Sequence, residues 1–428
     1  MSSAEAEEAK SVAAEVPHGA RRLSISKLKT FSSFKNPVFD LYYSSNLCQQ
    51  AAQNMQQMTR SLLVYRITGS AATLGLVSLA GAVPHILTSL FGGVVADRVQ
   101  KKYVLLIGMG AFSLVALSVA ILLTTGYLNK STWWILAVNS ALQSAIMGLI
   151  VPARSAMIRE IVGREGLMNA VALNTMGTNG WRLLAPAASG FLIDAFGFEA
   201  NFYIMAGLYA LGTILMVFMP RTSIKTASHK NAMEELKEGF KYIRGERDLM
   251  FILAFNLLAV VLAMPYQQMM PVFVDDVLKV GAKGMGILIS VSGIGALVGS
   301  VIIASLPSKR RGKLLLVGTL ILGISIMVFS FSKSWALSLG VMVVLGLGQT
   351  ARMTLSNTLA QHYTKDEYRG RVMGVYDMEM ALNSFSVYGA GVLTAAIGVQ
   401  LTIGGFAGVL VLVCLASLLF VPRMRRLE

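Results

Sequence analysis

Long apolar runs alternate with short polar segments along the chain after its first 37 residues. Twelve of these runs reach roughly 20 residues, the length that a helix needs to cross a bilayer. We therefore expect membrane-spanning helices at residues 39–65, 70–94, 103–127, 132–153, 168–193, 199–219, 249–274, 281–305, 313–332, 334–357, 371–397 and 400–421. Gln and Asn crowd the first run, so its apolar signal is the weakest. The pattern predicts an all-α integral membrane protein with twelve transmembrane helices.

Composition also favours a membrane protein. Hydrophobic residues make up 55% of the chain, charged residues 14%, and the mean hydropathy is +0.63, whereas a soluble domain carries about 25% charged residues. The first 37 residues are charged and rich in Ser and Ala without an apolar core, so we expect a tail rather than a cleavable signal peptide. Cys48 and Cys414 fall inside predicted helices, where we expect free thiols.

The net charge of +15 reflects membrane topology rather than a nucleic-acid site. Most of the 37 Lys and Arg residues lie in the first tail and on alternate loops. Because cytoplasmic loops carry the excess of Lys and Arg, we expect both termini in the cytoplasm of a multi-pass protein of the cell membrane. The expected environment is the lipid bilayer, with no nucleic-acid partner.

The chain divides into two similar halves. Three residues recur 211 positions later, Gln56 as Gln267, Gly75 as Gly286 and Lys102 as Lys313. We expect two pseudo-symmetric six-helix bundles related by an axis along the membrane normal, with a cargo site between them near the midplane. The expected parts are a cytoplasmic tail at 1–37, an N-terminal bundle at 38–219, a cytoplasmic linker with an amphipathic helix at 220–248, a C-terminal bundle at 249–421 and a cytoplasmic tail at 422–428.

The loop between the second and third spans combines a glycine, an acid and several bases. These residues are Gly93, Asp97, Arg98, Lys101 and Lys102. Glycine lets another helix approach closely, and a carboxylate can interact with a neighbouring helix N-terminus. The second half keeps the basic loop but has Ala304 and Ser308 in place of the glycine and the aspartate. A loop that only sets topology is the alternative.

This loop resembles the signature loop of the major facilitator superfamily, and residues 63–71, 151–158, 169–174 and 369–374 carry the same resemblance. More narrowly, the chain is similar to the twelve-helix bacterial drug and siderophore exporters of the drug:proton antiporter type. The resemblance implies a conformational latch that forms across the two halves when the cytoplasmic side is closed. Its residues here would be Gly93, Asp97, Arg98 and Lys102 in the loop, with Gly370 and Arg371 at the start of the eleventh helix.

The fifth span resembles a degraded form of the antiporter signature of these exporters. Its core residues here are Ala185, Pro186, Ser189 and Gly190. Small residues permit close helix crossing, and proline permits a bend. A close-packed helix pair without directional meaning is the alternative.

Polar side chains inside the spans indicate a hydrated cavity, because polar residues that face lipid are costly. The candidate cavity and substrate residues are Asn46, Gln50, Gln53, Gln57, Arg60, Asn139, Gln143, Arg182, Asn256, Gln267, Gln349, Arg352 and Asn383. Arg182 lies near mid-membrane, where it must pair with or bind an anionic group. Hydrogen bonding between helices, without a cavity, is the alternative.

Coupling to protons needs an acid that is protonated in one state and ionised in another. The candidates are Glu379 and then Asp377, roughly 10–13 Å from the cytoplasmic end of the eleventh span. Glu379 is preferred because it shares a face with polar residues, whereas Asp377 falls on a stripe of small residues. A structural ion pair with Arg352 is the alternative. The similar exporters often carry an acid in the first helix, where this chain has Gln53.

These features predict a secondary active transporter that exports amphipathic small molecules, drug-like compounds or siderophores, by proton antiport and alternating access. The export direction rests on the resemblance. We expect a monomer without a metal site or cofactor, driven by the proton gradient. A membrane enzyme is disfavoured because the sequence has no metal cluster, Cys–His pairing or phosphate loop. The alternatives are a lipid or lysolipid flippase of the same fold and a non-transporting membrane scaffold.

Overall fold

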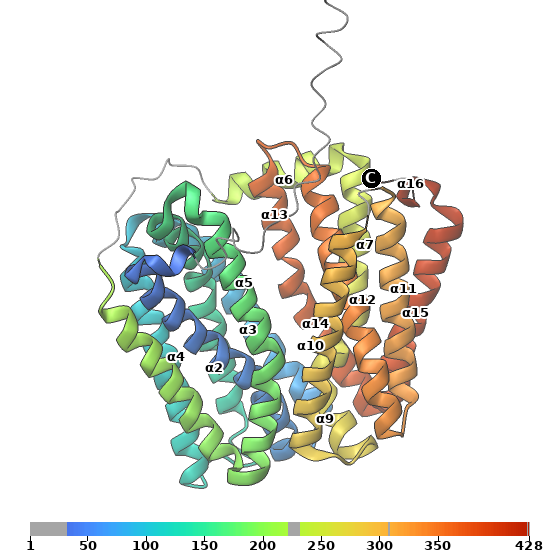
Figure 1. Ribbon diagram of the computed structural model, residues 1–428. Helices are drawn as coiled ribbons and strands as arrows, with labels where there is room; N and C mark the ends of the chain where they lie inside the picture. The colour runs from blue at the N-terminus through green and yellow to red at the C-terminus, as the bar shows by residue number, and fades with distance from the viewer. Residues whose placement is uncertain (1–31, 221–231, 307–308, 426, 428) are drawn as a thin grey trace, which may run out of the picture.

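The computed structural model describes the backbone of residues 32–220, 232–306, 309–425 and 427. Within these ranges, the side chains of residues 32, 35, 90–94, 96, 97, 164, 165, 232–236, 377, 380 and 381 lie outside the description. Every regular element in the described ranges is a helix, and the helices form two bundles side by side (Figure 1). The predicted all-α class is confirmed.

The N-terminal bundle contains α2 (Pro37–Thr68), α3 (Ala71–Arg98), α4 (Lys101–Thr124) and α5 (Trp134–Val217), preceded by the short helix η2 (Ser32–Lys35). The α5 element makes three passes, because its backbone leaves the helical conformation at Gly163 (φ 65°, ψ −169°) and Gly197 (φ 83°, ψ 175°). Glycine adopts such positive φ values without the strain that other residues would meet. The loops expected between the fourth, fifth and sixth spans are therefore reduced to turns at a single glycine.

The C-terminal bundle begins with a broken segment where a single helix at 249–274 is predicted. It consists of α7 (Arg247–Ala263), α8 (Pro265–Gln268), α9 (Met270–Val272) and the π-helical turn η3 (Phe273–Val277). Pro265 and Pro271 explain the breaks, since proline lacks the N–H that would continue the helical hydrogen bonds.

The remaining helices of this bundle follow the predicted spans except at one point. They are α10 (Gly281–Ser305), α11 (Arg311–Phe331), α12 (Trp335–His362), α13 (Arg369–Asp377), α14 (Glu379–Ile397), α15 (Val399–Phe420) and α16 (Pro422–Arg425). The exception is the predicted eleventh helix, which is divided at Met378. The two candidate coupling acids therefore stand on either side of this break.

Nine helical segments among the described residues are long and apolar enough to cross a membrane. One of them, Gly166–Val217, turns back at Gly197 and accounts for two passes. With α2, whose polar residues lower its hydropathy, and the α13–α14 pair, these segments are consistent with the twelve expected spans.

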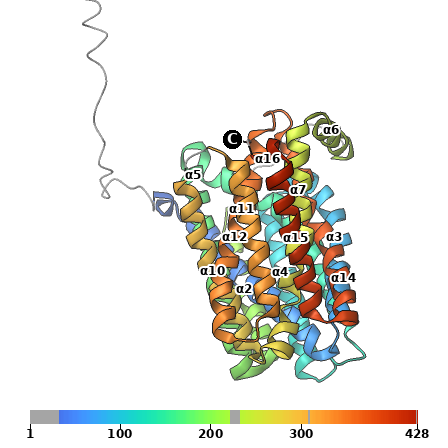
Figure 2. The ribbon, with the colours of Figure 1, turned by 90° about the vertical axis from the view of Figure 1, so that its right-hand side faces the viewer.

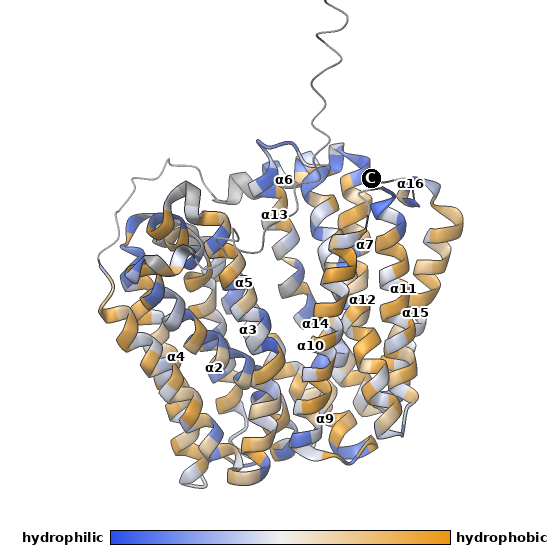
Figure 3. Ribbon diagram, viewed as in Figure 1, coloured by the Kyte–Doolittle hydropathy of each residue, from blue (hydrophilic) through white to orange (hydrophobic). Residues whose placement is uncertain are grey.

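The described chain ends lie at one end of the bundles, which we call the terminal end; the opposite end is the distal end. The linker helix α6 (Ala232–Gly245) and α16 lie at the terminal end (Figures 1 and 2). Arg371 pairs with Glu238 of α6 at 2.8 Å, and Tyr242 of α6 stacks on Tyr368 with ring centroids 4.3 Å apart. Figure 3 shows mostly hydrophobic residues along the outer helices α11 and α15 and hydrophilic residues gathered toward the terminal end.

The bundles meet along two seams, α5 against α10 and α3 against α14. Glycines allow the close approach. A Cβ on Gly286 would lie 2.4 Å from the carbonyl oxygen of Pro186, and a Cβ on Gly75 would lie 2.7 Å from the Cα of Tyr388. Gly75 and Gly286 are also the glycines that the sequence repeat pairs, so the two seams are related by the predicted pseudo-symmetry.

Candidate functional site

Polar side chains join the two bundles at the distal end. The guanidinium of Arg66, at the end of α2, donates to both carboxylate oxygens of Asp275, with Nε–Oδ2 3.1 Å and Nη2–Oδ1 3.2 Å. The hydroxyl of Tyr65 donates to Asp276, and the backbone N–H of Lys283 donates to Asp194 at 3.3 Å. These contacts are absent from the sequence predictions. The sequence did contain a signal for them, because the first span ends with a cation and the equivalent seventh span ends with two acids.

Reversing the charge of Arg66 should open the distal end. Arg66→Asp places a third carboxylate beside Asp275 and Asp276, and like charges at this distance repel. The wild-type pair is partly exposed and contributes at most about 1 kcal/mol, so its simple loss in Arg66→Ala should have a small effect. Distances between nitroxide labels on Lys130 and Lys333, in the distal loops of the two bundles, should lengthen in Arg66→Asp. Adding Asp275→Arg should restore them; unchanged distances in Arg66→Asp would contradict a closing role for the pair.

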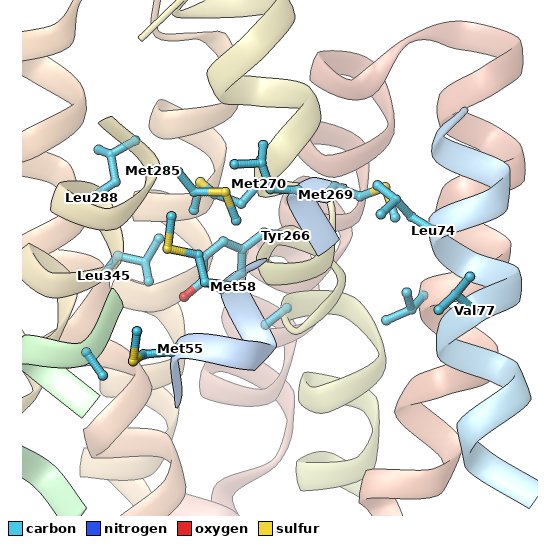
Figure 4. Close-up of a cluster of buried hydrophobic side chains, with 14 of the residues drawn as sticks. Met55, Met58, Leu74, Val77, Tyr266, Met269, Met270, Met285, Leu288 and Leu345 are labelled. Atoms are coloured by element: carbon cyan, nitrogen blue, oxygen red, sulfur yellow. The ribbon is translucent and has the colours of Figure 1, made fainter. Parts of the chain in front are cut away.

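Methionine side chains from both bundles gather in a buried cluster (Figure 4). Met55 and Met58 come from α2, Met269 and Met270 from the broken seventh span, and Met285 from α10, and all are buried. We call this cluster the methionine plug. Unbranched Met side chains adapt to irregular gaps, which suits a contact that must form and separate.

Toward the terminal end, the helix faces that form the α5–α10 seam are exposed. The α5 stripe that contacts α10 at Pro186 and Gly190 continues as the exposed residues Met168, Ala172, Thr175 and Arg182. The α10 stripe that contacts α5 at Gly286 continues as the exposed residues Leu297 and Val301. Because residues three or four apart lie on one helix face, the same faces are packed in the distal half and open in the terminal half. The bundles therefore diverge toward the terminal end.

A buried amide links Arg352 to Glu379 inside the C-terminal bundle. Arg352 Nη1 donates to Asn256 Oδ1 at 2.7 Å, and Asn256 Nδ2 donates to Glu379 Oε2. The exposed fractions are 5% for Arg352, 0% for Asn256 and 8% for Glu379. The ion pair considered from the sequence is thus mediated by Asn256, which pairs with both charges. The side chain of Asp377 lies outside the described residues.

The glutamines of the seventh and tenth spans meet at Tyr266 next to the methionine plug. The hydroxyl of Tyr266 donates to Gln349 Oε1 at 3.1 Å. Gln267 Nε2 donates to the same Gln349 oxygen and to the Tyr266 hydroxyl, both at 3.3 Å. The predicted residues Gln267 and Gln349 therefore form one cluster, whereas Asn383 is partly exposed and its Oδ1 has no hydrogen-bond partner among the described residues.

The polar face predicted on the first span is divided among different neighbours. Asn46 is buried and donates to Asn174, Gln53 donates to the sulfur of Met147 at 3.6 Å, and Arg60 donates to Gln143 at 3.3 Å. Gln57 is exposed, and the backbone oxygen of Gln50 accepts from Asn54 at 2.8 Å. Asn139 donates to the Val115 carbonyl of α4 at 3.1 Å. Several of these residues thus make hydrogen bonds between helices, which was the alternative to a cavity wall.

Arg154 takes part in a polar cluster that the sequence predictions missed. It follows the predicted end of the fourth span at residue 153, but in the structure it lies inside α5 against Tyr42, Asn46 and Gln49 of α2. Four atoms in this cluster have no hydrogen-bond partner among the described residues, Arg154 Nη2, the Tyr42 hydroxyl, Asn46 Oδ1 and Gln49 Nε2. Arg154 lies nine positions before the turn at Gly163, because the helix continues well past the predicted end of the span.

Two residues of the predicted latch make contacts that do not join the two bundles, Lys102 within the N-terminal bundle and Arg371 with the linker helix α6. Lys102 donates to the carbonyls of Val217 at 2.7 Å and of Met219, at a helix C-terminus where a cation is favourable. Arg371 pairs with Glu238, and Arg98 and Gly370 are exposed. The side chains of Gly93 and Asp97 lie outside the described residues, so the latch stays a prediction.

The antiporter-like signature lies in the α5–α10 seam. Ala185 and Pro186 are buried, and a Cβ on Gly190 would lie 2.5 Å from the Ala282 carbonyl oxygen of α10. The hydroxyl of Ser189 is 2.8 Å from that of Thr59 and accepts from Asn201 at 2.7 Å. The small residues therefore serve both contact between the bundles and hydrogen bonding within the N-terminal one.

A separate ion pair joins α16 to α7 at the terminal end. Arg423 donates to Asp248 Oδ1, and this hydrogen bond raises the pKa of the guanidinium above its usual value. The pair lines a surface hollow with Tyr363 and Leu427, away from the seams. Groups of three or more metal-ligating side chains are absent from the described residues.

Comparisons with known proteins agree on one family. Residues 42–386 match the family described as the Major Facilitator Superfamily. The enterobactin exporter of Shigella flexneri is 24% identical over 83% of this chain and 83% of its own length. The multidrug efflux pump Tap of Mycolicibacterium fortuitum is 24% identical over 86% of this chain and 91% of its own. A solved POT family transporter, 14% identical, superposes with a TM-score of 0.72 over 90% of this chain and 96% of its own.

Proposed function

Because this chain belongs to the Major Facilitator Superfamily, we propose that it is a secondary active transporter that exports amphipathic small molecules by alternating access. The relatives named as exporters of enterobactin and of multiple drugs support the direction and the broad cargo class. The proposed cargo site lies between the bundles, on the terminal side of the methionine plug.

The observation that carries this proposal is the asymmetry of the contacts between the bundles. The seams, the methionine plug and the Arg66–Asp275 ion pair join their distal halves, while the equivalent helix faces are exposed toward the terminal end. The positive-inside rule favours the terminal end as the cytoplasmic one, because it bears most of the Lys and Arg. The described state would then be inward-facing, ready to take cargo from the cytoplasm, with alternation occurring through rigid rocking of the bundles.

Proton antiport is proposed to act through Glu379. Its carboxylate is buried and linked through Asn256 to Arg352, a residue of another helix in the same bundle. Protonation would remove the negative charge from this chain of contacts and change how α12 and α14 are held together.

The experiment that tests the proposed function is cargo-triggered proton movement in inverted membrane vesicles, run across a panel of drug-like compounds and siderophores. Acidified vesicles that contain the protein should lose protons when a cargo is added and should accumulate that cargo. Vesicles from cells without the protein give the baseline. If no compound moves protons or is itself accumulated, the exporter proposal fails.

A lipid flippase is the second candidate, favoured by the exposed stripes of α5 and α10 beside Arg182. Such stripes could admit a lipid from the side. Translocation of a labelled phospholipid in liposomes, with no accumulation of small molecules in vesicles, would favour this candidate over export.

Substitution of Asp97 tests the proposed latch. Asp97→Asn should lower the transport rate roughly fivefold without changing the amount of protein in the membrane, because the amide keeps the shape but loses the charge that would interact with a helix N-terminus. Transport normalised to membrane protein is the measurement. Glu246→Gln, at an exposed acid of the same end, is the matched control. Undiminished transport by Asp97→Asn would show that the loop only sets topology.

A further inference from the structure

The interior of the bundles carries an excess of positive charge. Arg60, Arg154, Arg182 and Arg352 all lie in the inner turns of spans. Among the described side chains, Glu379 is the one acid at comparable depth. A charge at this depth is costly unless it is paired or faces water. Glu379 can balance the charge of one arginine, so the other three need water or another anion.

The partners of the two arginines in the N-terminal bundle are neutral. Arg60 donates to the amide oxygen of Gln143, and Arg154 lies against Tyr42 and Gln49. These groups are neutral, and Arg154 Nη2 has no hydrogen-bond partner among the described residues. The bundle therefore presents a positive field to the space beside it, and such a field concentrates anions.

Arg182 stands where the α5–α10 seam ends and the exposed stripe begins. Its neighbour Leu183 contacts Gly293 of α10, whereas Arg182 itself is exposed. It is thus the last exposed residue of the stripe before the seam closes, at the inner limit of the opening between the bundles.

The C-terminal bundle supplies a second guanidinium near Tyr266. The Tyr266 hydroxyl donates to Gln349 of α12, and Arg352 lies three positions after Gln349 on the same face of that helix. Arg352 is buried, and its Nε has no hydrogen-bond partner among the described residues. Gln267 donates to the same hydroxyl, which adds a neutral polar group to this face.

We infer that the cargo is an organic anion whose acidic group binds Arg182 at the inner limit of the opening between the bundles, with Arg352 adding positive charge from the C-terminal bundle. This inference rests on the proposed function and names the chemical class of its cargo. A carboxylate or phenolate suits a guanidinium, whose donors form paired, charge-assisted hydrogen bonds. The exposed apolar stripes of α5 and α10 would cover the hydrophobic part. An inside-negative membrane potential drives an anion outward, so the inference does not depend on how protons are coupled.

The inference is tested with fluorescein and rhodamine 123, two xanthenes of similar size and opposite charge. The full chain is reconstituted into phosphatidylcholine liposomes under a potassium diffusion potential, and binding is followed by fluorescence anisotropy. Fluorescein should bind and move in preference to rhodamine 123. Arg182→Gln should weaken fluorescein binding about tenfold, and Arg182→Lys, which keeps the charge but loses the paired donors, should weaken it less. Lys333→Gln, at an exposed distal residue, should leave it unchanged.

The outcomes separate this inference from the export proposal. Preference for rhodamine 123, or fluorescein binding unchanged by Arg182→Gln, overturns the anionic class while export stands. Translocation of labelled phosphatidylglycerol that depends on Arg182, without movement of fluorescein, keeps the anion site but assigns it to a lipid headgroup and defeats small-molecule export. If neither dye binds and no lipid moves, the anionic class is overturned, and the compound panel in inverted vesicles decides export separately.

Discussion

Replacement of Gly286 by leucine is expected to stop transport and to hold the protein with its distal end open. Even the first added carbon would lie 2.4 Å from the Pro186 carbonyl oxygen and 3.1 Å from the Ala187 Cα. Both are backbone atoms of a packed helix, which cannot turn aside as a flexible side chain can. Overpacking of this kind costs roughly 1–3 kcal/mol or more, and each 1.4 kcal/mol shifts the balance between two states about tenfold.

The measurement for Gly286→Leu is a pair of label distances together with transport. Labels on Lys130 and Lys333 should move apart at the distal end, labels on Arg159 and Lys365 should approach each other at the terminal end, and transport should fall at least about tenfold. Gly408→Leu is the matched control, because a Cβ on Gly408 meets no atom within 4 Å. Gly75→Leu should reproduce the effect through the second seam. Wild-type distances with normal transport in both seam variants would show that the seams do not govern closure.

The sequence predicted most of the fold because its strongest signals are local. Apolar length identified the spans, and the repeat of Gly75 at Gly286 indicated two similar halves, whose contact seams contain these two glycines. The breaks were harder to foresee. Pro265 and Pro271 lay inside a run apolar enough to look continuous, and a turn at a single glycine, as at Gly197, leaves no polar loop to detect.

The site was less predictable because its contacts join residues far apart in the chain. Periodicity placed Gln53 and Arg60 on one face, but it could not show that Arg60 meets Gln143. It proposed Arg352 as a partner for Glu379 but could not place Asn256 between them. The distal contact of Arg66 with Asp275 depends on how two bundles meet, which no single segment encodes.

Replacement of Glu379 by glutamine should abolish proton-driven accumulation while cargo exchange across the membrane continues. Glutamine keeps the size of the side chain and an oxygen that can accept from Asn256, so the packing of α14 should be retained. It cannot take up or release a proton, so the cycle loses its link to the gradient. We expect accumulation against a gradient to fall at least about tenfold and its dependence on pH to disappear.

Two further variants separate coupling from a structural role for Glu379. Glu379→Asp keeps a titratable group on a side chain one methylene shorter, so part of the pH dependence should return. If Glu379 has only a structural role, the shorter acid should restore nothing. Glu367→Gln, at an exposed acid of the loop before α13, is the matched control and should behave as wild type. Because exchange needs alternation but no net proton flow, loss of exchange together with accumulation in Glu379→Gln would assign this acid to holding α12 and α14 together through Asn256. Undiminished, pH-dependent accumulation would transfer the coupling role to another acid, with Asp377 the next to be replaced.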